Sequence, residues 1–84
     1  MMLKILYFAS LREMLGCGAE EIELPEGVGD VGGLMALLAG RSGEWAKLGA
    51  VKNLRYAVNQ EMARLDSPLK HGDEVAFFPP VTGG

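Results

Sequence analysis

The residues best suited to chemistry in this 84-residue chain are the last two, Gly83 and Gly84. They close the run FFPPVTGG, residues 77–84. The α-carboxyl of Gly84 has a reference pKa of roughly 3.3–3.7, so it is a carboxylate at neutral pH and reacts with nucleophiles only after activation. Because glycine has no Cβ and tolerates unusual backbone angles, two in succession would let the main chain enter a narrow site on another protein.

The body of the chain offers few catalytic side chains. His71, the single histidine, stands in a polar turn, and Cys17, the single cysteine, stands between two glycines. We interpret the first as a solvent-exposed turn residue and the second as a loop residue. The acidic residues between positions 20 and 26 lack EF-hand spacing and indicate a solvated strand edge. No nucleophile, base and oxyanion donor come together, so we expect no metal site and no autonomous enzyme.

A glycine-rich motif, GVGDVG at residues 27–32, fits the G-x-G-x-x-G pattern of dinucleotide-binding turns. Such a site also needs parallel strands and an acidic residue about 20 residues on, and residues 46–53 contain none. We interpret the motif as a turn and expect this chain to bind no cofactor. The sequence gives no reason for the pair Gly32-Gly33 near a helix start, where each glycine costs about 0.5–1 kcal/mol relative to alanine.

The elements that must position the terminus begin with an apolar segment, residues 3–9. Its aliphatic and aromatic residues predict a strand with two usable faces. Ile5 and Tyr7 would share one face, and Leu6 and Phe8 the other.

A short helix is predicted over residues 11–15, which glycines follow. Ser10 is the expected N-cap, and Glu13 would complete a capping box.

The main helix is predicted from Val31 to Leu38, because apolar residues recur there at helical spacing after Asp30, a good N-cap residue. We expect this helix to pack on the sheet. Residues 44–54 are ambiguous and suggest a helical turn around Trp45 followed by a loop.

Four further segments read as strands: residues 20–24, 55–59, 62–65 and 74–78. The first alternates charged and apolar residues, as edge strands do. Pro79-Pro80 ends the last strand, because proline cannot donate to a β-ladder.

The resulting order of strands and helices predicts an α+β protein with a mixed sheet of about five strands, one main helix and a shorter one. The β-grasp, or ubiquitin-like, arrangement is the compact solution that fits it, although pattern alone leaves other α+β orders open. We expect one β-grasp domain over residues 1–78 and a flexible tail over residues 79–84, which Pro79-Pro80 would stiffen at its base.

The composition of the chain argues against several classes of function. The net charge is −3 and the eight Lys and Arg residues are scattered, which argues against a nucleic-acid partner. The apolar segment after Met1 is too short for a signal peptide or a membrane span. Together with the lone cysteine, these features predict a cytoplasmic protein with no membrane partner.

One sheet face is expected to meet a partner. If Val75 and Phe77 face the core, Phe78 projects to the opposite face, where Phe8 and Met62 could join it in an apolar patch. The alternative is that the protein's own loops cover these aromatics.

The sequence resembles the small subunits of molybdopterin synthase, ubiquitin-like sulfur carriers. The resemblance rests on Tyr7 to Glu13 (YFASLRE), Ala57 to Gln60 (AVNQ) and above all Asp73 to Gly84 (DEVAFFPPVTGG). It covers the whole chain in length and order of elements.

The resemblance implies a covalent role for Gly84. A ubiquitin-activating-like adenylyltransferase would use ATP to adenylate Gly84, and a sulfur donor would convert it to a thiocarboxylate. The large subunit of molybdopterin synthase would then direct this sulfur to cyclic pyranopterin monophosphate, building a dithiolene. The implied interface with the large subunit comprises Phe8, Met62, Phe78, Pro79, Pro80, Val81 and Thr82.

Other functions remain open from the sequence alone. The chain could be a ubiquitin-like modifier that forms isopeptide bonds through Gly84, a sulfur carrier for thiamine or tRNA thiolation, or a plain interaction module. The sequence identifies neither the sulfur donor nor the role of Cys17. It also leaves open the stoichiometry of the complex, for which the resemblance implies two copies of each subunit, a heterotetramer.

Overall fold

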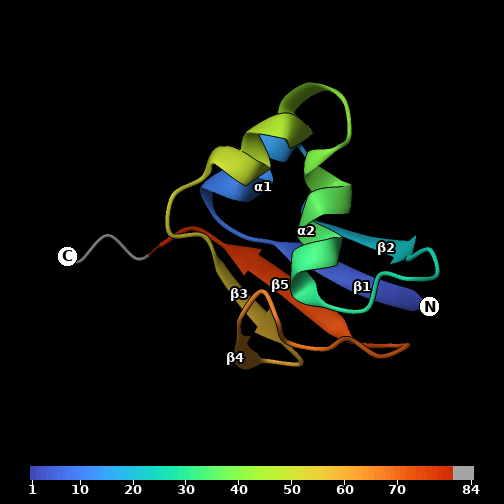
Figure 1. Ribbon diagram of the computed structural model, residues 1–84. Coiled ribbons are helices and arrows are strands. Elements are labelled where there is room, and N and C mark those ends of the chain that lie inside the picture. The colour runs from blue at the N-terminus through green and yellow to red at the C-terminus, as the bar shows by residue number, and fades with distance from the viewer. Residues whose placement is uncertain (81–84) are drawn as a thin grey trace.

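The structure is a computed structural model that describes residues 1–80 of the chain. Its helices and strands follow the predicted order (Figure 1). The elements are β1 (Met2–Tyr7), α1 (Ser10–Leu15), β2 (Ala19–Glu23), α2 (Val31–Ala39), the 3-10 helix η1 (Gly43–Ala50), β3 (Arg55–Val58), β4 (Glu61–Ala63) and β5 (Glu74–Phe78).

The five strands form one mixed sheet in the order β2-β1-β5-β3-β4. The two central strands, β1 and β5, run parallel, and every other pair is antiparallel. This topology confirms the α+β expectation and is that of a β-grasp fold. Because β1 and β2 are antiparallel, the glycine-rich turn that follows β2 does not belong to a dinucleotide-binding unit of parallel strands.

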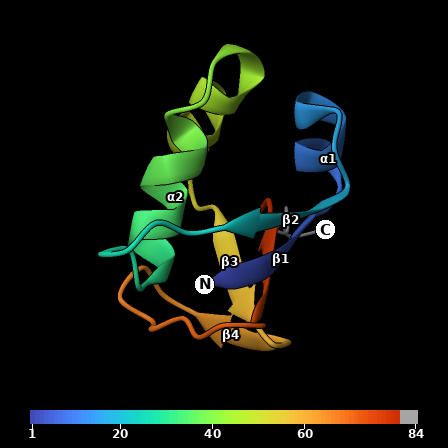
Figure 2. The same ribbon diagram turned by 90° about the vertical axis from the view of Figure 1, so that its right-hand side faces the viewer.

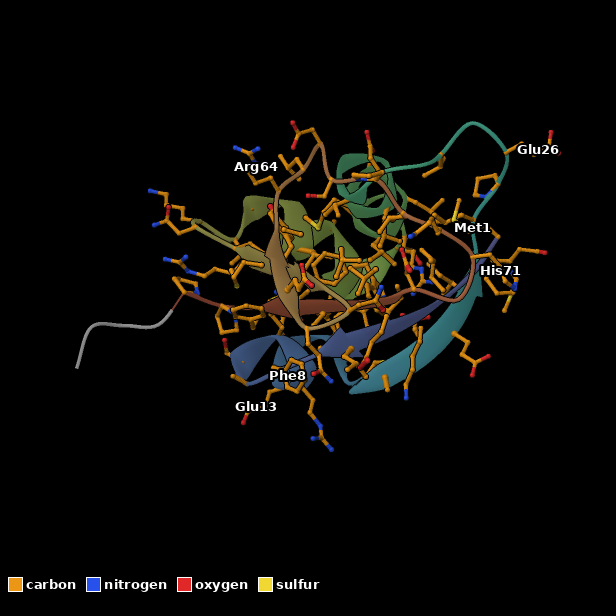
Figure 3. The ribbon with its side chains drawn as sticks, turned by 90° about the horizontal axis from the view of Figure 1, so that it is seen from below. Met1, Phe8, Glu13, Glu26, Arg64 and His71 are labelled. Carbon is orange, nitrogen blue, oxygen red and sulfur yellow. The ribbon has the colours of Figure 1, made fainter. Side chains whose placement is uncertain are left out.

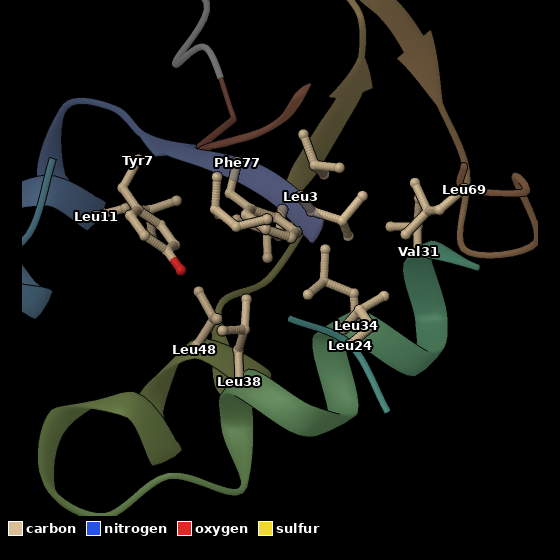
Figure 4. Close-up of a cluster of buried hydrophobic side chains, with 13 residues drawn as sticks. Leu3, Tyr7, Leu11, Leu24, Val31, Leu34, Leu38, Leu48, Leu69 and Phe77 are labelled. Carbon is tan, nitrogen blue, oxygen red and sulfur yellow. The ribbon is translucent and has the colours of Figure 1, made fainter. Parts of the chain in front are cut away.

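The core lies between α2 and one face of the sheet, called the inner face below (Figures 2 and 4). Leu34 and Leu38 of α2 are fully buried there, as are Ile5, Val75 and Phe77 of the two central strands. The predicted faces of β1 and β5 are therefore confirmed. The aromatic rings of Tyr7 and Phe77 stack within this core, with centroids 5.9 Å apart.

The start of α2 explains the glycine pair that the sequence left open. Asp30 caps the helix as predicted, because its side chain accepts a hydrogen bond of 2.8 Å from the Gly33 N–H. The Gly32 N–H donates to the Leu65 carbonyl at 2.8 Å, so the segment before β5 satisfies another unpaired donor of the first turn. A Cβ on Gly32 would lie 3.1 Å from that carbonyl oxygen, and one on Gly33 only 2.8 Å from Val28. The pair therefore lets two segments pack closely against the helix.

The prediction for α1 was partly wrong. The helix begins at Ser10 itself, its N-cap is Ala9, and no side chain caps it, so the expected capping box is absent. The helix ends as predicted, at Gly16 in the left-handed conformation. The turn between β3 and β4 also falls one residue earlier than expected, at Asn59 and Gln60, which both have positive φ.

Asp73 connects the turn between β3 and β4 to the start of β5 through hydrogen bonds. Its carboxylate, in a residue only 7% exposed, accepts 2.9 and 2.8 Å hydrogen bonds from the Asn59 side chain and the Lys70 N–H. Asn59 in turn accepts from the Glu74 N–H at 3.0 Å. Burial alone would raise the pKa of the Asp73 carboxyl, but the hydrogen bonds from Asn59 and Lys70 outweigh it, and the pKa lies below its ordinary value.

This arrangement predicts an acid-sensitive contribution to stability. Because the pKa of Asp73 is lower in the folded state, its contribution is complete above the ordinary aspartate pKa, about 3.9, and is lost as pH falls through the folded value. We expect Asp73→Asn to cost about 1.5–3 kcal/mol of unfolding free energy at neutral pH, with the difference from wild type shrinking in acid. Urea titrations across pH measure this. Equal losses at every pH would show that the charge of Asp73 is not the stabilising feature.

Candidate functional site

The terminal arm leaves the sheet at its centre. β5 lies between β1 and β3, ends at Phe78, and leads into Pro79 and Pro80. Gly83 and Gly84, which carry the predicted chemistry, lie outside the described residues, as do Val81 and Thr82 of the predicted interface. The structure therefore shows from which strand the arm departs and what surrounds its base.

The outer face of the sheet, opposite α2, carries an apolar row across all five strands. The strand register aligns Ala19, Leu6, Ala76, Ala57 and Met62 from one edge to the other. Alternation places each on the outer face, because their neighbours along β1 and β5 are core residues. The two middle positions are the small residues Ala76, which is partly buried, and Ala57, which is only 9% exposed.

Two aromatic residues extend the row towards the arm. Phe78 is half-buried at the end of β5, and Phe8, just after β1, is 48% exposed near Glu13 of α1 (Figure 3). Met62, on β4, is 62% exposed. The structure thus brings the three predicted body residues to one side of the sheet and adds neighbours that the sequence reasoning had not named. We call this set the outer-face patch: Leu6, Phe8, Ala57, Met62, Ala76 and Phe78.

Charged residues border the outer-face patch at both ends. At the end away from the arm, Lys4 is aligned with Glu21 on one side and Glu74 on the other. At the arm end, Arg55 is aligned with Phe78. An apolar centre with a charged rim is the usual composition of a protein interface.

Ala9 holds an unusual backbone conformation beside Phe8, with φ 54° and ψ −130°. Alanine rarely adopts positive φ, and such a residue costs of order 1–3 kcal/mol unless its surroundings impose the conformation. The surroundings here are fixed: the Phe8 N–H donates to the Phe77 carbonyl at 3.1 Å, and the Glu13 N–H donates to the Ala9 carbonyl at 3.3 Å. Ala9 therefore turns the chain from the central strand into α1 and leaves Phe8 at the surface.

We expect Ala9→Gly to stabilise the protein by about 1 kcal/mol, because relief of the positive φ outweighs the added freedom of glycine in the unfolded chain. Ala36→Gly, at an exposed position inside α2, is the matched control and should cost about 1 kcal/mol instead. Urea unfolding of both variants measures the difference. A loss of similar size in both would mean that Ala9 is not strained.

A polar cluster on the helix side corrects the interpretation of Glu20 as a solvated edge residue. Glu20 accepts a 2.8 Å hydrogen bond from the Tyr7 hydroxyl and forms a two-pronged ion pair with Arg41 at 3.0 and 3.1 Å. The Arg41 guanidinium also lies 4.5 Å from the Trp45 ring centre. The cluster ties the segment after α2 to the edge strand β2.

Two groups of the cluster, Tyr7 and Arg41, have raised pKa values. Burial, followed by the hydrogen bond to Glu20, raises the pKa of Tyr7 above its usual range, so its hydroxyl stays a donor. The hydrogen bond to Glu20 raises the pKa of Arg41. Because both ends of the ion pair are partly exposed, its contribution to stability is of the order of 1 kcal/mol or less. We assign this cluster a structural role.

The remaining candidate side chains stay apart from one another. The Nδ1 atom of His71 accepts a hydrogen bond from the Met2 N–H at the end of the molecule away from Phe8 (Figure 3). The Cys17 thiol donates to the Ala19 carbonyl at 3.4 Å. Within residues 1–80 no three His, Cys, Asp or Glu side chains are grouped to hold a metal ion. No helix in the same range has the length and apolarity to cross a membrane.

The fold defines a class: small ubiquitin-like proteins built on a β-grasp domain. The chain matches the ThiS family over residues 5–84 and belongs to that family.

Relatives agree with this placement. The molybdopterin synthase sulfur carrier subunit of Escherichia coli (strain K12) is 45% identical, with 99% of this chain and 100% of that protein covered. Among solved structures, SAMP1 from Haloferax volcanii, a small archaeal modifier protein, superposes with a TM-score of 0.80 at 28% identity, covering both chains fully. The complex of subunits 1 and 2 of molybdopterin-converting factor from Helicobacter pylori 26695 contains a chain with a TM-score of 0.68 and 29% identity, again with full coverage of both.

Proposed function

We propose that this chain is the sulfur-carrier subunit of a molybdopterin synthase and that Gly84 carries the sulfur. The observation that carries the proposal is the family match, which runs the length of the fold and on to Gly84. The relative from Escherichia coli bears the name of this function at 45% identity. The described part of the chain adds a central strand that delivers the arm beside an apolar face, with no cluster of catalytic side chains around it.

The proposed chemistry takes place at the carboxyl carbon of Gly84. A carboxylate oxygen attacks the α-phosphorus of ATP in an activating enzyme, pyrophosphate leaves, and an acyl-adenylate results. Hydrosulfide (HS⁻) supplied by a sulfur donor then attacks the acyl carbon, AMP leaves with the bridging oxygen, and loss of a proton gives the thiocarboxylate. Transfer of this sulfur to cyclic pyranopterin monophosphate returns Gly84 to the carboxylate once water supplies the oxygen. Two such cycles supply the two sulfurs of the dithiolene.

In this proposal the chain's own residues position and present the sulfur. The outer-face patch docks on the large subunit, and the arm from Pro79 to Gly84 enters that subunit's active site. An extended arm of six residues spans about 20 Å, enough to reach a buried site. Pro79 and Pro80 restrict the base of the arm and reduce the entropy lost on docking.

The chain itself binds no cofactor in this proposal, and ATP is consumed only in the activating enzyme, a ubiquitin-activating-like adenylyltransferase. The reaction would take place in the cytoplasm, where thiols and the single cysteine remain reduced.

Reconstitution tests the proposal. Purified carrier is incubated with activating enzyme, ATP and a sulfur donor, and the product is added to large subunit and cyclic pyranopterin monophosphate. We expect dithiolene to form in proportion to carrier, at two carriers per pterin. Absence of dithiolene, with an authentic carrier active in the same assay, would contradict the proposal.

A second candidate function rests on the likeness to small archaeal modifier proteins. A modifier would use the same adenylate at Gly84 but pass its acyl group to a lysine amine, forming an isopeptide bond. Conjugates on lysines of other proteins, visible as a ladder after incubation with activating enzyme and cell extract, would favour this function. The carrier function predicts thiocarboxylate and no ladder.

A further inference from the structure

The segment that leads into β3 gives the base of the arm a positive character. Residues 45–60 contain Lys47, Lys52 and Arg55 but no Asp or Glu, in a chain whose net charge is −3. Lys47 is paired with Glu44 at 2.8 Å. Lys52 and Arg55 are exposed, and within residues 1–80 no carboxylate oxygen lies within 4.0 Å of either side chain. We call these two residues the cationic rim.

Arg55 of the cationic rim adjoins both the arm and the outer-face patch. The register aligns Arg55 with Phe78, the last residue of β5. Asn53, Leu54, Arg55 and Pro80 together line an open hollow, so Arg55 borders the first described residues of the arm. Asn53, with φ 57°, turns the chain between Lys52 and Arg55. Arg55 is therefore continuous with the proposed docking face, and Lys52 precedes it by three residues in the chain.

The cationic rim and the terminal group of Gly84 have opposite charges, and a partner must match both. Cations stand at the base, an uncharged stretch follows, and the carboxylate or thiocarboxylate of Gly84 stands at the tip. The site that receives the tip must stabilise an anion at its floor. The surface around its entrance, which faces the cationic rim, then favours the opposite sign, since like charges brought together at an interface cost several kcal/mol.

We infer that Lys52 and Arg55 contact carboxylate side chains on the large subunit, at the edge of the entrance that receives the arm. The inference rests on the proposed function and adds the chemistry of the partner surface to it. Charges at the edge of an interface mainly speed encounter and fix orientation, and they add less to the lifetime of the complex. The cationic rim therefore aligns the arm with the entrance before the outer-face patch closes on the partner.

The test compares two doubly substituted carriers of equal charge. Lys52→Gln/Arg55→Gln removes the cationic rim, and Lys47→Gln/Arg64→Gln removes two cations elsewhere, so each takes the formal net charge from −3 to −5. Arg64 lies on the opposite side of the molecule from Phe8 (Figure 3). Association rate constants with the large subunit are measured at low and high ionic strength, after thermal unfolding confirms that both variants are folded.

We expect the rim variant to associate roughly tenfold more slowly at low salt and to lose most of its salt dependence, while the control stays within about twofold of wild type. Arg55→Glu should slow association further, and replacing one entrance carboxylate of the large subunit by arginine should restore it. Equal rates and salt slopes for the two double variants would overturn the inference. A Phe78→Asp carrier is measured alongside. If only this carrier fails to bind, the result supports the proposed docking face and contradicts the role of the cationic rim.

Discussion

Deletion of Gly84 is expected to abolish sulfur transfer and to leave the thermal unfolding midpoint almost unchanged. The shortened chain ends in a carboxylate on Gly83, which falls about 3.3–3.6 Å short of both the adenylating site and the large-subunit site. A misplacement of about 1 Å can already cost about a hundredfold in rate. The described core lies within Leu3–Phe77, so stability should not depend on the last residue.

Two further variants distinguish the effect of the length of the arm from the effect of the shape of its last residues. One residue added after Gly84 places the reactive carbonyl inside an amide, so we expect no adenylate and no thiocarboxylate. Gly83→Ala keeps the length and adds one methyl group, and we expect a milder loss, largest where the channel is narrowest or where Gly83 needs positive φ. Dithiolene formation with purified large subunit measures all three. Turnover near the wild-type rate by the carrier lacking Gly84 would remove Gly84 from the mechanism.

Phe78→Asp is expected to weaken binding to the large subunit by about a hundredfold while the domain stays folded. Burying a phenylalanine against a partner contributes roughly 1.5–3 kcal/mol, and an unpaired carboxylate in the interface adds a desolvation cost. Calorimetric titration measures the affinity, and circular dichroism measures the fold.

Leu65→Asp is the matched control for Phe78→Asp. Leu65 is exposed, and its Cβ lies 3.6 Å from the position that a Cβ on Gly32 of α2 would take, on the helix side of the sheet. It introduces the same charge away from the outer-face patch and should leave the affinity near wild type. Unfolding of the Phe78→Asp protein would show that Phe78 belongs to the core. Equal affinities for both variants would place the interface elsewhere.

Much of the fold could be predicted because its determinants are local. Alternation predicts that Phe78 faces away from the core if Val75 and Phe77 face it, and the structure confirms that both of these residues are buried. Asp30 caps α2 through a donor only three residues away, so its role is visible in the sequence. The departure of the arm from β5 follows from Pro79, which ends the strand.

The predictions that failed concern residues whose contacts lie far away in the sequence. Glu20 was interpreted as a solvated charge because its partner, Arg41, lies 21 residues further on, beyond the reach of spacing rules. Gly32 allows close contact with the Leu65 carbonyl, which comes near only in the folded chain. Ser10 has the right type for an N-cap, but the cap position falls on Ala9, where hydrogen bonds to neighbouring elements fix the backbone. The cationic rim was not predicted, because the role of its residues depends on their position near the arm in the folded chain.

The most direct test of the account is to locate the sulfur atom within the carrier. The protein is incubated with activating enzyme, ATP and sulfur donor, and its intact mass and C-terminal fragment masses are recorded. We expect the intact mass to rise by the difference between one sulfur and one oxygen, and fragmentation to place that rise on Gly84. Sulfur found on Cys17 instead, or a mass that stays unchanged while an authentic carrier is converted under the same conditions, would contradict the account.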